Sequence, residues 1–221
     1  MSSDYVSRLK VIDCCALSDA LDRLKLGGAV TGLPQQSGAG RIAGRAVTVR
    51  LGTGDPPPGP PRHLGTTAIE ASGPETIIVV EQRTGVEAGC WGGLLTLGAR
   101  RRGVAGVVAD GPVRDIDEAR GYGFPIFTNR TTCFTARGRV VEKATNEPVT
   151  IGDTTVEPSD YVVADNSAVI IIKPIDVERV LETAERIIAR EAAMARAIEA
   201  GTPIGEVMGG NYEHMLTEPQ A

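Results

Sequence analysis

Short apolar segments give this sequence its clearest structural constraint. Thr76–Val80 and Val104–Ala109 consist of β-branched and small apolar residues, and Ala168–Lys173 has the same character. This composition is typical of buried strands. Arg41–Leu51 also predicts a strand, because apolar residues alternate along it with Arg and Thr.

Helices are expected at both ends of the chain and between the strands. Leu9–Leu24 and Trp91–Arg102 carry apolar residues at roughly helical spacing, and each is followed by glycine. Val177–Ala200 predicts a long, charged amphipathic helix. Shorter elements are predicted as helices at His63–Ala71 and Arg114–Arg120, and as β segments at Pro125–Thr128, Val140–Val141, Val149–Ile151, Thr154–Val156 and Tyr161–Asp165.

The segment Gly52–Pro61 interrupts this pattern. Its composition, with five prolines and three glycines, is compatible only with a loop of local polyproline character. The glycines Gly38, Gly40 and Gly44 lead into a strand rather than a helix, so they predict a turn and no nucleotide-binding loop.

Charge and composition exclude several classes of function. The net charge of -5 and the content of only eight aromatic residues (Phe 3, Tyr 4, Trp 1) disfavour binding to nucleic acid. Two histidines and the absence of a Cys-x-x-Cys motif argue against zinc, which leaves a hard cation bound by oxygen as the expected metal.

The sequence predicts a cytoplasmic protein with no membrane partner. The longest apolar stretch, Ala168–Ile172, is too short to span a bilayer, and no signal peptide is visible. The four cysteines show no spacing typical of a disulfide framework. Cys90 precedes a helix and is either a thiol of lowered pKa or a packed core residue. His63 and His214 are expected at the surface or in packing.

Residues Gly85–Phe127 contain the most informative motifs. Gly92-Gly93 opens a helix with bare backbone N–H groups, which can hold a carboxylate or phosphate. The strand Val104–Ala109 leads into Asp110-Gly111 and then Arg114-Asp115. An arginine there can bind a carboxylate or keto oxygen, and the aspartate can ligate a divalent cation. A structural ion pair explains the same spacing equally well.

This stretch resembles the RraA-like family, which contains class II pyruvate aldolases and regulators of RNase E activity. The combination Trp-Gly…Asp-Gly-x-x-Arg-Asp carries the resemblance, together with Ser18–Leu21, Gly44–Val49 and Pro148–Pro174. The family implies an α/β fold: one compact domain of the swivelling β/β/α type spanning 1–221, with a core at about 9–175 and a C-terminal helix and tail at 176–221. It also implies a homotrimer or hexamer with active sites between subunits.

The resemblance also implies roles for individual residues. Arg114 would bind the pyruvoyl group of a 2-oxo acid and stabilise an enolate, and Asp115 would ligate Mg²⁺ or Mn²⁺. The helix start at Gly93, Leu94 and Leu95 would hold the substrate carboxylate. Glu191 of a neighbouring subunit would assist the metal, or else is a solvated residue of its helix.

One position departs from the aldolase pattern. The aldolases carry an acid, then twenty residues, then Arg-Asp, and the matching position here is Gly93. Asp110, Glu87 or a carboxylate of a neighbouring subunit are the alternatives for the missing acid–base group.

The leading hypothesis from these observations is a metal-dependent carbon–carbon lyase that releases pyruvate from a 2-oxo acid. The alternatives are a non-catalytic, ring-forming regulator that binds an RNase-type partner, and a relative redirected to another substrate.

Overall fold

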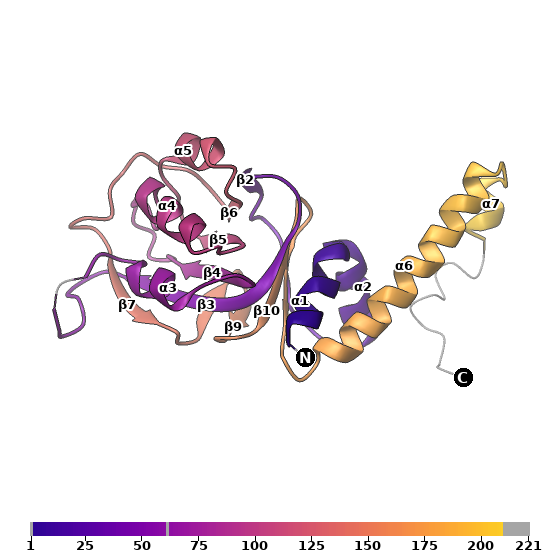
Figure 1. Cartoon of the computed structure of the whole chain (residues 1–221), viewed down its shortest axis with the longest axis horizontal. Coiled ribbons are helices and arrows are strands. Elements are labelled where there is room, and N and C mark those ends of the chain that lie inside the picture. The colour runs from indigo at the N-terminus through magenta and orange to yellow at the C-terminus, as the bar shows by residue number, and fades with distance from the viewer. Residues whose placement is uncertain (1, 61, 210–221) are drawn as a thin grey trace.

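The computed structural model describes residues 2–60 and 62–209, and nine strands of this part form one mixed sheet (Figure 1). They are β1 (Ala29–Val30), β2 (Gln35–Ser37), β3 (Ile42–Gly52), β4 (Thr76–Glu81), β5 (Gly106–Asp110), β6 (Ile126–Thr128), β7 (Val141–Thr145), β10 (Tyr161–Ala164) and β11 (Val169–Ile172). Neighbouring strands follow the order β1-β11-β10-β3-β4-β5-β6-β2, and β7 also pairs with β3. The steps from β3 to β6 are parallel and the others are antiparallel. A separate hairpin pairs β8 (Val149–Ile151) with β9 (Thr154–Val156).

Helices pack against two regions of this sheet. They are α1 (Ser2–Val11), α2 (Cys14–Arg23), α3 (Thr66–Ala71), α4 (Gly93–Arg101), α5 (Ile116–Gly121), α6 (Val177–Glu199) and α7 (Ile204–Val207). Residues of α3, α4 and α5 share a core cluster with the parallel strands. Residues of α1, α2 and α6 share another with β10 and β11. The result is a mixed α/β fold with a C-terminal helix, as predicted.

The strand β4 shows why its sequence is apolar at successive positions. Side chains alternate between the two faces of a strand, and both faces of β4 are covered. Ile78 and Val80 lie in the cluster with α3 and α4, whereas Ile77 and Val79 pack with residues of β8 and β9. All four side chains are fully buried, which confirms the buried strand predicted from composition.

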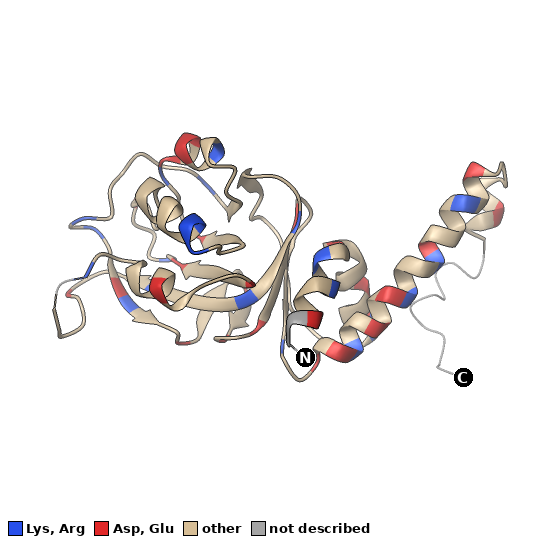
Figure 2. Cartoon of the chain, viewed as in Figure 1, with Lys and Arg blue, Asp and Glu red and all other residues tan. Residues whose placement is uncertain are grey.

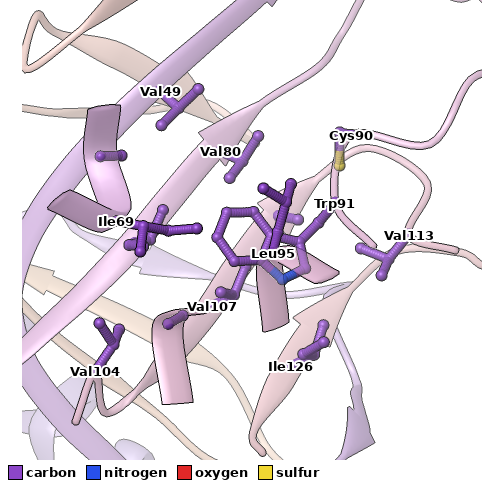
Figure 3. Close-up of a cluster of buried hydrophobic side chains, with 14 of the residues drawn as sticks. Val49, Ile69, Val80, Cys90, Trp91, Leu95, Val104, Val107, Val113 and Ile126 are labelled. Atoms are coloured by element: carbon purple, nitrogen blue, oxygen red, sulfur yellow. The ribbon is translucent and has the colours of Figure 1, made fainter. Parts of the chain in front are cut away.

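Trp91 anchors the start of α4 in the core (Figure 3). Its ring is buried with Ile69 of α3 and Leu95 of α4, and its indole N–H donates a hydrogen bond of 3.0 Å to the hydroxyl of Thr96. An apolar ring with a satisfied polar atom fixes a loop firmly, so the residues just after Trp91 have a defined position.

The helix predicted at Leu9–Leu24 is wrong, because two helices occupy this region. Asp13 adopts an extended conformation between α1 and α2, and its carboxylate accepts a hydrogen bond of 2.9 Å from the backbone N–H of Ala16. An N-cap of this kind starts a new helix. The apolar spacing continues across the break because both helices face the same core.

The C-terminal helix α6 extends well beyond the sheet (Figure 1). Its first half is buried against α1 and α2 as far as Ile187, and charged residues follow one another along the projecting part (Figure 2). No helix within the described ranges is long and apolar enough to cross a membrane. His214 and the rest of the predicted tail after residue 209 lie outside the described residues.

Candidate functional site

The loops that follow β4 and β5 meet at the carboxyl ends of these parallel strands. The backbone N–H of Cys90 donates to the carbonyl of Pro112 at 2.8 Å, and that of Arg114 donates to the carbonyl of Trp91 at 3.0 Å. Carboxyl ends of parallel strands are the usual place for ligand sites in α/β sheets. These bonds bring Arg114 and Asp115 to the start of α4.

Asp115 joins the two parts of this candidate site. One of its carboxylate oxygens accepts a hydrogen bond of 3.0 Å from the backbone N–H of Gly93, and the other accepts one of 3.2 Å from Nε of Arg114. Its backbone is left-handed, with φ of 59°, directly before α5. Backbone strain of this kind in a non-glycine residue is common at functional sites.

Two glycines allow the arginine to lie against the backbone. A Cβ atom on Gly89 would lie 3.0 Å from Cγ of Arg114, and one on Gly92 would lie 3.0 Å from the carboxylate of Asp115. Side chains at these positions would push the pair away from the start of α4.

A cavity of about 880 Å³ opens beside the Arg114–Asp115 pair. The proline-rich loop, the first turn of α4 and the segment through β7 contribute to its wall. Four of the charged side chains on this wall are cationic and two are anionic, so it favours an anionic ligand although the whole protein is acidic. These residues are Arg62, Arg114, Arg137, Lys143, Asp115 and Glu142.

The predicted substrate-binding residues Gly93, Leu94 and Leu95 all line this cavity. Leu94 is largely exposed and Leu95 is buried in the core, so neither side chain offers a polar contact. Their backbone N–H groups belong to the first turn of α4, where no carbonyl of the same helix is in position to accept them. The helix start therefore has amide donors that could bind an anion.

The structure places Asp110 outside this cavity. Its carboxylate accepts hydrogen bonds from Asn129 at 2.8 Å and from the backbone of Gly152 at 2.9 Å, and it lies 3.5 Å from Nε of Arg83. These contacts tie the end of β5 to the β8–β9 turn. Asp110 therefore holds a structural position and is not available beside Arg114.

Glu87 and Glu191 are not among the described residues that line the cavity beside the pair. Glu87 lies 3.6 Å from Arg130. Glu191 lies on α6, on the other side of the molecule from α4 and α5 (Figure 1). Partial burial and the nearby carboxylates of Asp13 and Asp19 raise the pKa of Glu191.

Glu118 is the residue that the sequence analysis missed. A Cβ atom built on Gly93 would lie 1.9 Å from a carboxylate oxygen of Glu118, so this side chain fills the space beside Gly93. The sequence feature that could have indicated Glu118 is its place three residues after Asp115 in a predicted short helix. Residues three apart in a helix lie on the same face.

The two other candidate residues, Cys90 and His63, lie in different surroundings: Cys90 is buried and His63 is exposed. Burial raises the pKa of the Cys90 thiol to about 12, so it remains protonated at neutral pH and fits the packing alternative. His63 lies on the cavity wall, with Nδ1 3.0 Å from the carbonyl of Leu64.

A divalent cation fits this site only if substrate and water complete its shell. Within residues 2–60 and 62–209, no three His, Cys, Asp or Glu side chains are grouped closely enough to hold a metal ion. Each carboxylate oxygen of Asp115 accepts one hydrogen bond, which leaves a further lone pair on each. Mg²⁺ often uses one protein carboxylate together with water and substrate oxygens, so Asp115 is a suitable ligand.

Comparison with known proteins gives a family match over most of the chain. The model of the RraA-like family, described as Aldolase/RraA, matches residues 14–171. A curated relative from Halalkalibacterium halodurans is 28% identical over 197 residues, which cover 88% of this chain and 89% of the relative. That protein carries the provisional name 4-hydroxy-4-methyl-2-oxoglutarate aldolase.

Two further similarities concern length and fold. Protein DlpA of Legionella pneumophila is 26% identical over 208 residues, and the match covers 92% of this chain but only 34% of DlpA. This chain therefore spans about a third of that relative. A crystal structure of an uncharacterized protein from Pseudomonas syringae pv. tomato superposes with a TM-score of 0.83 at 25% identity, covering 94% of this chain and 98% of the other.

Proposed function

The chain belongs to the RraA-like family, and on that premise we propose that it is a divalent-metal-dependent carbon–carbon lyase acting on a small 2-oxo acid. The reaction is decarboxylation of oxaloacetate, retro-aldol cleavage, or both, and it yields pyruvate. The observation that carries this proposal is the Arg114–Asp115 pair, held against the start of α4 at the wall of a cationic cavity.

Arg114 and the start of α4 would bind the oxygen atoms of the substrate. Arg114 presents a planar set of N–H donors, which suits the keto oxygen and adjacent carboxylate of a 2-oxo acid. The backbone N–H groups of Leu94 and Leu95 would donate hydrogen bonds to the substrate carboxylate, and the helix start favours its negative charge. Mg²⁺ or Mn²⁺ on Asp115, when bound, supplies positive charge where the enolate develops.

Breaking the carbon–carbon bond leaves an electron pair that the keto acid takes up as an enolate. The guanidinium of Arg114 stabilises the enolate oxygen, which carries more charge than the keto oxygen it replaces. Loss of CO₂ needs no base, whereas retro-aldol cleavage needs one to remove the hydroxyl proton. Gly93 contributes no acid. Its presence should therefore slow retro-aldol cleavage more than decarboxylation.

Pyruvate release from oxaloacetate tests this proposal. Purified protein with Mg²⁺ should release pyruvate faster than Mg²⁺ alone, and Arg114→Ala should lose the excess rate. Arg101→Ala is the matched control, because Arg101 is exposed near the far end of α4. A wild-type rate equal to that of the metal alone, or an unchanged Arg114→Ala variant, would contradict the proposal.

We also propose that the chain works as a homotrimer or hexamer, with Glu191 reaching the site of a neighbouring subunit. Glu191 belongs to α6, which projects away from the sheet on the other side of the molecule from α4 and α5 (Figure 1), so this role needs a second subunit. The four free cysteines support a reducing compartment such as the cytoplasm.

The second candidate function is a non-catalytic regulator that binds a protein partner such as an RNase. Gly93 favours it, because the aldolase acid is missing there. Titration of the protein with Mg²⁺ and pyruvate separates the two: a lyase binds both, and a regulator with a vestigial site binds neither.

A relative redirected to another substrate is the third candidate. Its support is the extra charge of the cavity, where Arg62, Arg137 and Lys143 add to Arg114. Such an enzyme would bind Mg²⁺ and a larger anion while leaving oxaloacetate unchanged.

A further inference from the structure

We propose that Lys143 and the proline-rich loop form a second anion subsite in the cavity. The substrate is then an extended 2-oxo acid with an apolar middle and a second anionic group at its far end. This inference rests on the proposed lyase function and names the substrate class of that site. Its starting observation is a juxtaposition: Nζ of Lys143 donates a hydrogen bond of 2.7 Å to the carbonyl of Asp55, and Lys143 lines the same cavity as Arg114.

The cavity is larger than a four-carbon acid requires. Its volume of about 880 Å³ lies near the upper end of the range of about 300–1,000 Å³ that is usual for sites of drug-sized ligands. Arg114 comes just before α5, whereas Lys143 belongs to β7, and Figure 1 shows α5 and β7 well apart. A substrate that contacts both cations therefore needs an extended chain between its two ends.

The ammonium group of Lys143 is held in place without being neutralised. Its stem lies against Gly52, where an ideal Cβ would lie 2.9 Å from Cγ and 3.0 Å from Cε of Lys143. The carbonyl of Asp55 accepts one of the three N–H donors of the ammonium. No carboxylate within residues 2–60 and 62–209 forms an ion pair with it. Two donors and the full positive charge therefore remain for a ligand.

Two arginines add positive charge to the same wall. Arg62 and Arg137 line the cavity, and neither forms an ion pair with a carboxylate in the described part of the chain. Glu142 is the neighbouring acid, but its carboxylate accepts the N–H of Gly65 at 2.6 Å and the hydroxyl of Thr145. The wall around Lys143 therefore carries an excess of unpaired cations, which favours an anionic group of a ligand.

The rest of this wall is largely apolar. Its residues include Pro56, Pro57, Pro58, Leu64 and Val140. Proline has no backbone N–H, so the proline-rich loop offers few hydrogen-bond donors to a ligand. Its restricted backbone also lowers the entropy that is lost when a ligand orders the loop. A chain of methylene groups suits this part of the cavity better than further charged groups do.

Two unreactive ligands of equal chain length, 2-oxooctanedioate and 2-oxooctanoate, test the subsite. They differ only in the terminal carboxylate, and neither carries the 4-hydroxyl or the β-carboxylate from which the proposed lyase reactions start. Calorimetric titration of the full chain with Mg²⁺ present measures both affinities. We expect the diacid to bind about 10-fold or more tightly than the monoacid, the usual effect of one charge-assisted hydrogen bond. The shorter pair 2-oxoglutarate and 2-oxopentanoate should show a smaller ratio, because its second carboxylate does not reach Lys143.

Three variants locate the effect. Lys143→Met keeps an apolar stem and removes the charge, so the diacid and the monoacid of the longer pair should bind about equally. Lys143→Arg keeps a cation and should retain most of the ratio, which separates the loss of charge from a folding defect. Lys10→Met is the matched control, because Lys10 is an exposed lysine near the end of α1, and this variant should keep the wild-type ratio.

The outcomes separate this inference from the proposed function. Wild-type protein that releases pyruvate from oxaloacetate but binds the two longer ligands equally overturns the subsite and leaves the lyase intact. A Lys143→Met variant that keeps the full preference for the diacid overturns the role of Lys143. Wild-type protein that binds neither longer ligand overturns the proposed substrate class, whereas pyruvate release decides the lyase function independently.

Discussion

The guanidinium of Arg114 is held by its neighbours before any substrate arrives. The backbone N–H donates to Trp91, Nε donates to Asp115, and the side-chain stem lies close to Gly89. A group fixed in this way need not be ordered when the substrate binds, which favours stabilisation of developing charge.

Replacement of Arg114 by lysine tests whether the planar fork of donors matters. Lysine keeps the charge but cannot bind two oxygens in one plane. We expect kcat/KM for oxaloacetate to fall about 10- to 100-fold, the loss of one charge-assisted hydrogen bond. Steady-state kinetics measure it, and an unchanged thermal melting curve serves as the control. A lysine variant with wild-type kinetics would show that charge alone suffices.

Asp165 gives a prediction about pH. Burial acts to raise its pKa, but hydrogen bonds from the N–H groups of Cys14 and Ser167 and from Arg41 outweigh burial and lower it. Because the folded pKa lies below the unfolded one, the ionised carboxylate stabilises the protein at neutral pH. This contribution is lost as the pH falls through the acidic range of the carboxyl.

Asp165→Asn should therefore lower the free energy of unfolding by about 1–3 kcal/mol at pH 7. The difference from wild type should shrink at pH 3, where the wild-type carboxylate is itself taking up a proton. Urea unfolding at the two pH values measures this. A difference of the same size at both values would contradict an electrostatic origin.

The contrast between Asp110 and Glu118 shows which site residues a sequence can reveal. Arg114 and Asp115 were predictable because a strand, a turn and a pair of charges stand together in the chain. Asp110 stands in the same motif, but its partners Asn129 and Gly152 are distant in sequence. Glu118 belongs to α5, and only the packing of α5 against α4 places its side chain beside Gly93.

At the scale of elements, apolar strands were predicted more accurately than polar ones. The strand β3 pairs on one side with β10 along its first residues and with β7 along its last. The strand β7 extends to Thr145, well past the predicted Val140–Val141, because its residues pair with the last residues of β3. Its half-buried side chains line the cavity. Polar residues in a strand give no hydrophobic pattern, so the sequence alone does not mark it.

The break between α1 and α2 depends on Asp13, whose carboxylate caps the N–H of Ala16. We expect Asp13→Ala to lower the free energy of unfolding by about 0.5–2 kcal/mol, the usual effect of losing an N-cap. Asp13→Ser should recover most of this loss, because serine also caps. Denaturant unfolding monitored by circular dichroism measures both variants. Equal stabilities of the alanine and serine variants would show that the cap does not set this boundary.

At the scale of the whole molecule, the described residues at the projecting end of α6 and in α7 include exposed apolar side chains. Ile198, Ile204 and Met208 are all exposed at this end. Exposed apolar side chains gathered at one projecting end of the molecule favour contact with another chain. The proposed trimer or hexamer follows from the family resemblance, because subunit contacts leave no periodic pattern in the sequence.

Light scattering after size-exclusion chromatography tests the proposed assembly. We expect a mass three or six times that of the 23.2 kDa chain, and Ile198→Glu on α6 together with Ile204→Glu on α7 should reduce it if this end of the chain makes the contact. A mass of one chain for the wild type would contradict the assembly and remove Glu191 from the site. An oligomer unaffected by the variants would place the contact elsewhere.

A crystal structure with Mg²⁺ and oxalate, which resembles the enolate of pyruvate, tests the central claim most directly. We expect oxalate in the cavity within hydrogen-bond distance of the Arg114 guanidinium and of the backbone N–H groups of Leu94 and Leu95, with the cation on Asp115. Oxalate bound elsewhere, or a cation that leaves Asp115 untouched at saturating concentration, would contradict it.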